Sequence, residues 1–314
     1  MVLHLDEDEV KRLLTMDDCI QVLDDLFRQE ARGEAENKPM TEFYVQGGGF
    51  LRMKAGIVDA AKAIGFKTYS GPGRRLVFVL DQKANLLGIV DAVHLTQVRT
   101  GAVSAVATRY MARPESASIG ILGTGKEART QLEALVRVRP VTRIKAYSRD
   151  PEHRATFAAE MSKRLDVEVE PVESAEACVK DTDIVVTATS TNTPILPADW
   201  IADGVHICAV GATGMFRREL DEIAIARASS VVVENLEQAR EELGELALAV
   251  QRGKLRWSHM HELRDVVSGT VPGRNSPEDV TLFDSIGVGT EDVAVAAHLL
   301  TRAREESVGT ELDM

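Results

Sequence analysis

The sequence is poor in aromatic side chains and in bases, and these shortages exclude several kinds of partner. Phe, Tyr and Trp make up 4% of the 314 residues, and 37 Lys and Arg stand against 49 Asp and Glu, which leaves a formal charge of −12. Nucleic acids and anionic membranes bind basic surfaces, and stacked bases need aromatic platforms. We therefore expect neither a nucleic acid nor a membrane as a partner.

Cysteines and long apolar runs are also scarce. Cys19, Cys178 and Cys208 are the only cysteines, and their spacing fits neither a disulfide framework nor a zinc site, so we expect reduced thiols and no metal. The longest apolar stretches, Leu76–Leu80 and Ile184–Ala188, are far shorter than the roughly 18 residues of a membrane span. The first ten residues carry acids where a targeting peptide carries bases, so the expected location is cytoplasmic.

The first third of the sequence predicts helices followed by an antiparallel sheet. Apolar residues at three- and four-residue spacing over 10–14 and 20–27 are typical of two amphipathic helices. Between 40 and 87, short segments rich in strand-forming residues alternate with glycine-containing breaks. A further helix over 96–111 ends before Pro114, where we place a domain boundary.

The rest of the chain alternates short strands with helices. The expected strands are 118–122, 143–147, 167–169, 184–187, 205–210 and 230–233, and a last helix covers about 292–304. Such alternation is typical of a parallel sheet with helices on both faces. The predicted fold class is α/β, with a doubly wound Rossmann domain over 116–291. The remaining residues, 1–115 and 292–314, form an α+β domain with the antiparallel sheet.

A glycine-rich turn opens the first strand–helix unit. Gly123, Thr124, Gly125 and Ala128 follow strand 118–122 in the pattern G-x-G-x-x-A. Gly123 permits the tight turn, Gly125 lets the backbone approach a pyrophosphate, and Ala128 lets the helix pack against the sheet. The alternative is a β–α turn without a ligand. The position of the motif in a βαβ unit favours a dinucleotide site.

The residues after the second strand bear on the choice of cofactor. An acid there accepts hydrogen bonds from the ribose 2′-hydroxyl of NAD and repels the 2′-phosphate of NADP. Ser148 and Arg149 occupy this place and suit a phosphate, so we predict NADPH. NADH is the alternative if Asp150 reaches back to the ribose. Other cofactor contacts are expected at the ends of later strands, from Thr187, Ala188, Thr189 and Val210.

Several sequence blocks follow one another over nearly the whole chain. They are Gly65-Phe-Lys67, Val98-Arg99-Thr100-Gly101, Gly120–Gly125, Arg218-Glu-Leu-Asp221, Pro272-Gly-Arg274, and Thr281–Gly287 followed by Glu291-Asp-Val. In this order the blocks resemble the ornithine cyclodeaminase/mu-crystallin family, which includes an archaeal alanine dehydrogenase and several imino-acid reductases. The resemblance implies a homodimer. Its α+β domain would bind the substrate and form the dimer contact, with the active site between this domain and the Rossmann domain.

The resemblance also implies three substrate-binding cations, Arg52, Lys67 and Arg99. Two guanidinium groups and an ammonium can hold a carboxylate by charge-assisted hydrogen bonds. A lysine beside two arginines should have a lowered pKa, which suits it to exchange a proton with the substrate nitrogen. Lys54 stands where the family usually has proline and is either a fourth cation or a surface residue.

One departure from the family pattern concerns the reaction. Cyclodeaminases carry an aspartate two residues after the glycine that ends the fifth Rossmann strand, whereas here Thr213 follows Gly211. A threonine hydroxyl can hydrogen-bond an imine but cannot deprotonate ornithine, and ketimine reductases of the family resemble this chain in having a small hydroxyl residue there. The resemblance further puts Gly287 and Val288 against the nicotinamide ring, with an ordinary turn as the alternative.

The favoured activity is therefore the reduction of a small α-imino acid. Hydride from NAD(P)H would reach the C=N carbon of a cyclic ketimine such as pyrroline- or piperideine-2-carboxylate, or of a linear imine, giving an L-amino acid. Ornithine cyclodeaminase and alanine dehydrogenase are the alternatives among enzymes. A non-catalytic protein that binds NADPH and a small ligand is the alternative of another class.

Overall fold

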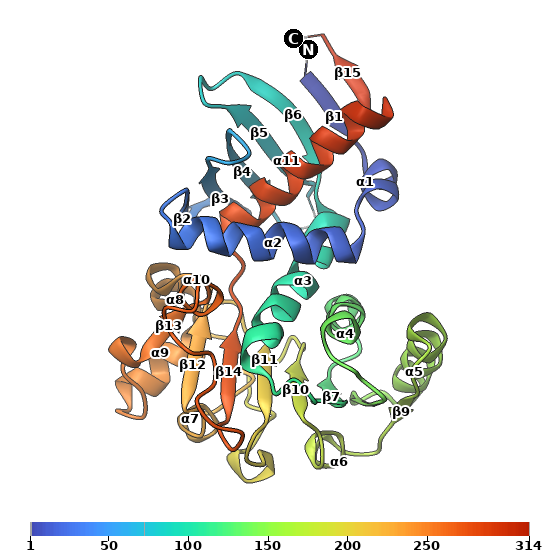
Figure 1. Ribbon diagram of the computed structural model, residues 1–314, viewed down its shortest axis with the longest axis vertical. Helices are drawn as coiled ribbons and strands as arrows, with labels where there is room; N and C mark the ends of the chain where they lie inside the picture. Colours follow the sequence, from blue (N-terminus) through green and yellow to red (C-terminus); the bar gives the residue numbers. More distant parts are fainter. Residues whose placement is uncertain (1, 72, 314) are drawn as a thin grey trace. The chain divides into compact units, whose positions relative to one another are not determined.

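The computed structural model describes residues 2–71 and 73–313, which divide into two compact units (Figure 1). Unit 1 contains Met1–Val103 and Gly287–Met314, and unit 2 contains Ser104–Ile286. The first division falls inside helix α3 (Val93–Met111), so Pro114 marks the end of that helix and not the division between the units. The assignment of substrate and cofactor binding to separate domains stays a prediction.

Unit 1 is built on a seven-stranded sheet of order β15-β1-β6-β5-β4-β3-β2. Its strands are β1 (Val2–Leu5), β2 (Ala35–Tyr44), β3 (Phe50–Val58), β4 (Ala63–Tyr69), β5 (Arg75–Asp81), β6 (Leu86–Asp91) and β15 (Thr310–Leu312). The neighbours run antiparallel except β1 and β6, so the sheet is mixed and mostly antiparallel. The sequence missed β1 and β15, because three or four residues carry too little alternation to predict a strand.

Strand β2 begins five residues before the expected start of the sheet. Pro39 lies inside it, and the pairing with β3 shifts register between Lys38 and Thr41. A proline removes one ladder hydrogen bond and is tolerated at an edge strand or a bulge. Strand β2 is such an edge strand, which explains why a segment that reads as a break in the sequence pairs in the structure.

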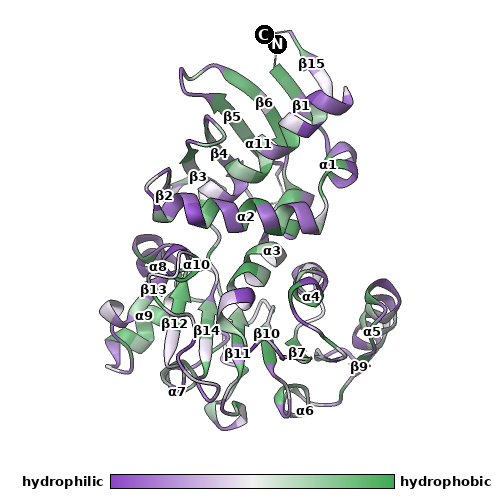
Figure 2. Ribbon diagram, in the orientation of Figure 1, coloured by the Kyte–Doolittle hydropathy of each residue, from purple (hydrophilic) through white to green (hydrophobic). Residues whose placement is uncertain are grey.

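Three helices complete unit 1 together with the start of α3. They are α1 (Glu7–Leu13), α2 (Met16–Ala31) and α11 (Gly289–Glu306). The two predicted N-terminal helices are thus confirmed, and α2 shows alternating hydrophobic and hydrophilic turns in Figure 2. Helix α11 packs against α2 and against strands β3, β4 and β5. It starts three residues before the expected Asp292, and the acids of its first turn, Glu291 and Asp292, are buried.

Unit 2 contains an eight-stranded sheet of order β13-β12-β14-β11-β10-β7-β8-β9. Its strands are β7 (Ser118–Leu122), β8 (Arg143–Tyr147), β9 (Val169–Pro171), β10 (Ile184–Thr187), β11 (His206–Ala209), β12 (Ser230–Val233), β13 (Met260–Glu262) and β14 (Thr281–Asp284). All neighbours pair in parallel, which confirms the doubly wound sheet. The strand order reverses beside β7, where α/β sheets bind their ligands at the carboxyl ends of the strands.

Short helices connect these strands. They are α4 (Lys126–Val138), α5 (Pro151–Leu165), α6 (Ala175–Val179), α7 (Glu222–Ala226), α8 (Leu236–Glu242), α9 (Gly244–Gln251) and α10 (Leu263–Val267), with single turns η1 (Ala198–Trp200) and η2 (Trp257–His259). Buried side chains of α4 and α5 pack on β7 and β8 and form a core that includes Ile121, Leu132 and Phe157. Within the part of the chain that the structure describes, no helix has the length and apolar character of a membrane span. The cytoplasmic location stays a prediction.

Candidate functional site

Two lysines of unit 1 lie opposite one another on neighbouring strands. Lys54 of β3 is paired in register with Lys67 of β4, and both side chains are buried. Lys67 Nζ donates to Oδ1 of Asp292 in α11 at 2.8 Å, and Lys54 Nζ donates to the carbonyl oxygen of Gly287 at 2.7 Å. Lys54 is therefore a buried cation and not a surface residue, a fourth cation beside the predicted Arg52, Lys67 and Arg99.

Helix α3 adds the guanidinium of Arg99 to this group. Its Nη1 donates to Oε2 of Glu291 at 3.0 Å, and its Nε lies 3.4 Å from Oδ1 of Asp292. Gly287 has a φ of +63°, and a Cβ there would lie 2.3 Å from Arg99 Nη1, so a side chain at this turn would be strained and would displace the guanidinium. We call Lys54, Lys67, Arg99, Glu291 and Asp292 the charged cluster.

Arg52 lies two residues before Lys54, on the same face of β3 and at the rim of the charged cluster. About a third of its side chain is exposed, and its Nε donates to Oε1 of Glu42 at 2.6 Å. The guanidinium also lies over the Phe50 ring, 4.7 Å from its centroid. Tyr69, the register partner of Arg52, lies under both Arg52 and Lys67.

Burial dominates the electrostatics of the charged cluster. It lowers the pKa of Lys67 to about 7, with further lowering by Arg99 and Lys54 against the opposing effect of Asp292. The direction is the expected one, but loss of water contributes more than the neighbouring cations. Burial also raises the pKa of Asp292, yet Lys67 and Arg99 outweigh this effect and hold the value below its ordinary range.

The sequence prediction assigned no role to Glu291 or Asp292. Both are fully buried at the first turn of α11, a helix whose next positions are Val293, Ala294 and Val295. Acids are rarely buried without a cationic partner. Two adjacent acids directly before an apolar helical run could therefore have indicated that buried cations lie elsewhere in the chain. Which cations they meet is decided only by the packing of α11 on the sheet.

The glycine-rich turn of unit 2 has the geometry that a dinucleotide needs. Gly123 has a φ of +112°, and a Cβ there would lie 2.3 Å from the carbonyl oxygen of Ala188. Gly125 is the N-cap of α4 and has open space around its Cα, so the backbone can be approached closely. Ala128 is buried in the helix–sheet core. Thr124 donates to Ser148 Oγ at 3.0 Å and bonds Nδ1 of His153 at 2.8 Å.

The end of β8 carries Ser148, Arg149 and Asp150. Arg149 is exposed, and no interaction with another described residue involves it. Asp150 is the N-cap of α5, where one carboxylate oxygen accepts from the backbone N–H groups of Glu152 and His153 at 3.0 Å. The acid is thus engaged in helix capping.

Four other expected cofactor residues lie at the carboxyl ends of β10 and β11. Val210 N donates to Thr187 O at 2.9 Å, and Ala188 N donates to Leu122 O at 2.8 Å. The hydroxyls of Thr187 and Thr189 both donate to one buried acid, Glu219, which the sequence prediction did not assign to the site.

The last two expected residues divide between the units. Thr213 is exposed in unit 2, two residues after Gly211. Val288 is buried in unit 1 and is the N-cap of α11 beside the charged cluster. The structure therefore groups the predicted substrate-binding cations within unit 1 and the residues of the glycine-rich turn within unit 2.

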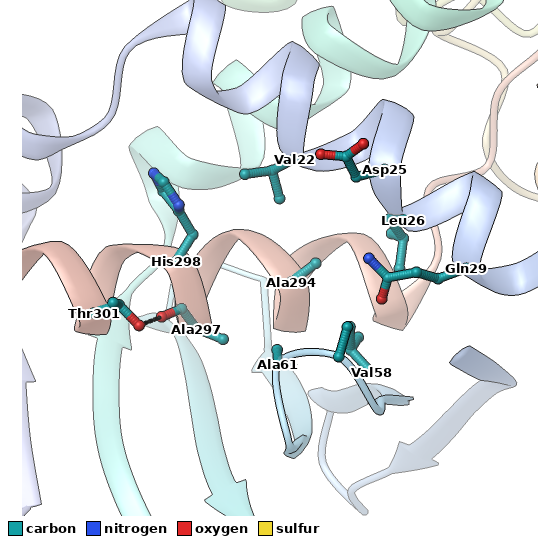
Figure 3. A pocket seen from close by; sticks show the side chains of 11 residues that line it. Val22, Asp25, Leu26, Gln29, Val58, Ala61, Ala294, Ala297, His298 and Thr301 are labelled. Atoms are coloured by element: carbon teal, nitrogen blue, oxygen red, sulfur yellow. Dashed lines mark hydrogen bonds between the residues drawn. The ribbon is translucent and has the colours of Figure 1, made fainter. Parts of the chain in front are cut away.

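A separate cavity of about 300 Å³ lies in unit 1 between α2, α11 and the turn after β3 (Figure 3). Gln29 and His298 face it over an apolar floor that includes Val58 and Ala294. None of the described residues that line it belongs to the predicted site. The described residues also contain no group of three or more His, Cys, Asp or Glu side chains arranged to hold a metal.

Comparisons with known proteins find relatives along nearly the whole chain. The chain is 32% identical to alanine dehydrogenase of Archaeoglobus fulgidus over 99% of this chain and 98% of that protein. It is 36% identical to a Delta(1)-pyrroline-2-carboxylate reductase of Bacillus cereus over 82% and 78% of the two chains. The structure of Thermococcus litoralis Delta(1)-pyrroline-2-carboxylate reductase with NADH and L-proline matches with a TM-score of 0.94, 31% identity and coverage of 99% and 100%.

A family model for the ornithine cyclodeaminase/mu-crystallin family matches residues 2–307. The match covers both units and every site residue discussed above, and it confirms the resemblance drawn from the sequence blocks. The chain belongs to the ornithine cyclodeaminase/mu-crystallin family.

Proposed function

We propose that this protein reduces the C=N bond of a small α-imino acid to give an L-amino acid, with hydride supplied by a nicotinamide dinucleotide. Its enzyme class is that of an NAD(P)H-dependent oxidoreductase acting on imines. The observation that carries the proposal is the charged cluster, in which a buried lysine of pKa about 7 lies beside a buried arginine. This combination can bind a carboxylate and also exchange a proton near neutral pH.

The residues of unit 1 have separable roles in this proposal. Arg99, with Arg52 at the rim, binds the substrate carboxylate and so orients the imine carbon. Lys67 exchanges the proton at the substrate nitrogen, since both of its protonation states are populated at pH 7. Asp292 holds the Lys67 ammonium in place at 2.8 Å. The cofactor supplies only the hydride to the carbon.

Thr213 favours reduction over cyclodeamination. Cyclodeamination first removes hydride from an amino acid that carries a second ammonium group, and a carboxylate at this position would balance that charge. An exposed hydroxyl at 213 can hydrogen-bond an imine nitrogen but carries no charge at neutral pH. The substrate is therefore expected to lack a second amine.

The end of β8 favours NADPH over NADH. The exposed Arg149 is available to pair with a 2′-phosphate, and the Asp150 carboxylate already caps α5. The related structures from Thermococcus litoralis and Paracoccus denitrificans contain NADH and NAD⁺. The preference for NADPH is thus a property of this chain's own residues at 148–150.

The face of the unit 1 sheet opposite α11 supports a homodimer. It presents half-buried apolar side chains on four strands, and the Phe66 and Phe78 rings stack with centroids 5.1 Å apart. Phe43 and Leu51, paired across β2 and β3, are 52% and 40% exposed on the same face. An apolar face of this extent is typical of a protein interface, and a related archaeal alanine dehydrogenase is a dimer.

A charge on this face tests the dimer. We expect Phe66→Glu to weaken the dimer by at least about 100-fold, since it places a carboxylate in the centre of an apolar interface. Light scattering coupled to size exclusion measures the mass. Phe216→Glu, at an 88% exposed phenylalanine of unit 2, is the control. A dimer that persists unchanged in Phe66→Glu would contradict the assignment of this face.

A substrate panel tests the reaction. Absorbance of NADPH and NADH is followed with cyclic ketimine carboxylates and with pyruvate plus ammonia or methylamine, and L-ornithine is tested in parallel for ammonia release. We expect oxidation of NADPH on an imine in preference to NADH. Ammonia from ornithine with no net change in reduced cofactor would identify a cyclodeaminase, and cofactor binding without turnover of any substrate would support the binding-protein alternative.

A further inference from the structure

A single buried carboxylate joins the ends of two strands in unit 2. Glu219 is fully buried, and each of its oxygens accepts two hydrogen bonds. Oε1 accepts from the backbone N–H and the hydroxyl of Thr189, both at 2.6 Å. Oε2 accepts from the Thr187 hydroxyl at 2.8 Å and from the Gly211 N–H at 2.9 Å. The side chain thus connects the carboxyl end of β10 with that of β11.

The chain around Glu219 is packed too closely to move independently. A Cβ on Gly211 would lie 2.2 Å from the carbonyl oxygen of Thr189 and 2.6 Å from Glu219 Oε1. On the other side, the backbone N–H of Glu219 donates to Oε2 of Glu245 at 2.7 Å, and Leu220 N–H donates to the same oxygen at 3.0 Å. Glu245 therefore fixes the backbone of Glu219, and Glu219 fixes the two strand ends.

These strand ends border the glycine-rich turn. Ala188, between the two threonines held by Glu219, contacts Gly123 so closely that no side chain fits there. In a doubly wound sheet the phosphates lie at such a turn, the adenosine side lies over the next strand, here β8, and the nicotinamide side lies over the opposite half. Strands β10 and β11 belong to that opposite half.

We propose that Glu219 is a positioning residue for the nicotinamide half of the cofactor. It sets the spacing of β10 and β11 at their carboxyl ends, and so places Thr187–Thr189 on one side and Gly211–Thr213 on the other. The proposal rests on the dinucleotide-dependent function proposed above. Glu219 itself acts only through the residues that it holds, because all four of its contacts are within the protein.

The substitution Glu219→Gln tests this role sharply. Each carboxylate oxygen faces a backbone N–H, and a backbone N–H cannot accept a hydrogen bond. Whichever way the Gln amide is turned, its NH₂ group therefore opposes either Thr189 N–H or Gly211 N–H. One strand end must shift, although the size of the side chain hardly changes.

Asp183 offers a matched control at the opposite end of β10. Its carboxylate also accepts four hydrogen bonds, from Arg113, from Ala117 N–H, and from the N–H and hydroxyl of Ser118. It joins the amino ends of β7 and β10, away from the cofactor edge. Asp183 is half-buried and paired with Arg113, but Asp183→Asn disturbs the same number of hydrogen bonds and should lower the melting temperature without altering the cofactor site.

The experiment titrates each full-length protein with NADPH and NADH by fluorescence and records the melting temperature and the kcat and KM for the imine. An unsatisfied buried donor should weaken cofactor binding by about 10-fold or more in Glu219→Gln, and Asp183→Asn should stay within about 2-fold of the unsubstituted protein. Thr187→Val, which removes one donor and suits a strand, should give a smaller loss and serves if Glu219→Gln does not fold. Equal loss in the Glu219 and Asp183 variants would show a purely structural role.

The outcomes separate this proposal from the function on which it rests. If the unsubstituted protein binds neither dinucleotide, the proposed function fails. If it binds them and Glu219→Gln and Thr187→Val bind them equally well, the proposed function stands and the positioning role of Glu219 is overturned.

Discussion

Each unit contains a buried set of charged side chains, and the charges of the two sets are compensated in different ways. The charged cluster of unit 1 balances cations with acids, as in Lys67 with Asp292 and Arg99 with Glu291. The buried group of unit 2 consists of acids alone: Glu219, Glu234, Glu245 and Asp284. There the negative charge is met by N–H and O–H donors, for example when Glu234 accepts from the Ser285 hydroxyl and the Ile286 N–H.

The difference shows in the proton affinities. In unit 1, burial lowers the pKa of Lys67 to about 7. In unit 2, burial raises the pKa of Glu245 to about 7, and burial together with the charges of Glu245, Glu234 and Glu219 raises that of Asp284 well above its usual value. Loss of water thus favours the neutral form of acids and bases alike. Only the charged cluster of unit 1 pairs cations with acids, and a substrate carboxylate could replace an acid in such a pair.

The largest effect is expected from removing the lysine of unit 1. Lys67→Ala should lower kcat by at least about 1,000-fold, because it removes the proton exchange and part of the carboxylate site. Binding of NADPH should be nearly unchanged, since the phosphate turn belongs to unit 2. Lys83→Ala, at an exposed lysine in the turn before β6, is the control. Full activity in Lys67→Ala would contradict the roles proposed for the charged cluster.

Replacing an aspartate by asparagine in each group should have different effects on stability. Asp292→Asn leaves a buried cation short of its counter-charge and should lower the free energy of unfolding by about 3 kcal/mol. It should also lower the pKa of Lys67 further, because Asp292 is the acid that raises it. Asp284→Asn relieves repulsion among acids and should change stability by less than about 1 kcal/mol. Urea unfolding at pH 6, where the Lys67 ammonium is charged in the unsubstituted protein, measures both, and similar losses would contradict the contrast.

The two groups should also respond to pH in opposite directions. The pKa of Glu245 is about 7 in the folded state and 4.5 ordinarily, so the folded state binds this proton more tightly than the unfolded state. The resulting contribution to the free energy of unfolding is lost as pH rises from 4.5 to 7. The pKa of Lys67 is about 7 in the folded state and 10.5 ordinarily, so the unfolded state binds this proton more tightly. The free energy of unfolding therefore rises with pH between 7 and 10.5 as far as Lys67 is concerned.

Glu245→Gln tests the acid side of this contrast. The fall in unfolding free energy between pH 5 and pH 7.5 should become smaller by roughly 3 kcal/mol, the equivalent of the change in pKa. Thermal unfolding at both pH values measures it. Identical pH profiles for the two proteins would show that Glu245 is ionised throughout this range.

A smaller effect on catalysis than that of Lys67→Ala is expected at an exposed charge outside both groups. Arg149→Ala should lower kcat/KM for NADPH by about 10-fold and leave the value for NADH nearly unchanged, because it removes one ion pair with the 2′-phosphate. Arg143→Ala, at the other end of β8, is the control. If NADH is preferred before and after the substitution, the preference for NADPH is wrong.

Local signals in the sequence predicted most of the fold. The alternation of strands and helices after residue 117 gave the parallel sheet, and strands β7, β8 and β10 have the expected bounds. The signals failed where an element is short or where its pairing overrides a local preference. Strand β15 has three residues, and β2 contains Pro39. In both cases the partner strand supplies the hydrogen bonds that the segment itself does not predict.

Residue type and local spacing account for the features that depend on neighbouring residues. The turn at Gly123 needs a positive φ, and the helix after it needs a close approach to the sheet, so residue type and spacing suffice. Family resemblance then added the cations Arg52, Lys67 and Arg99. All of these concern single residues or short spacings.

The partners of the buried charges come from packing between segments that are far apart in the chain. Lys67 and Asp292 are 225 positions apart, and Thr189 and Glu219 are 30 apart. A buried charge is tolerated only when a partner reaches it, and its proton affinity depends on how much water the surrounding chain excludes. Both conditions are set by packing between distant segments, which no local pattern records.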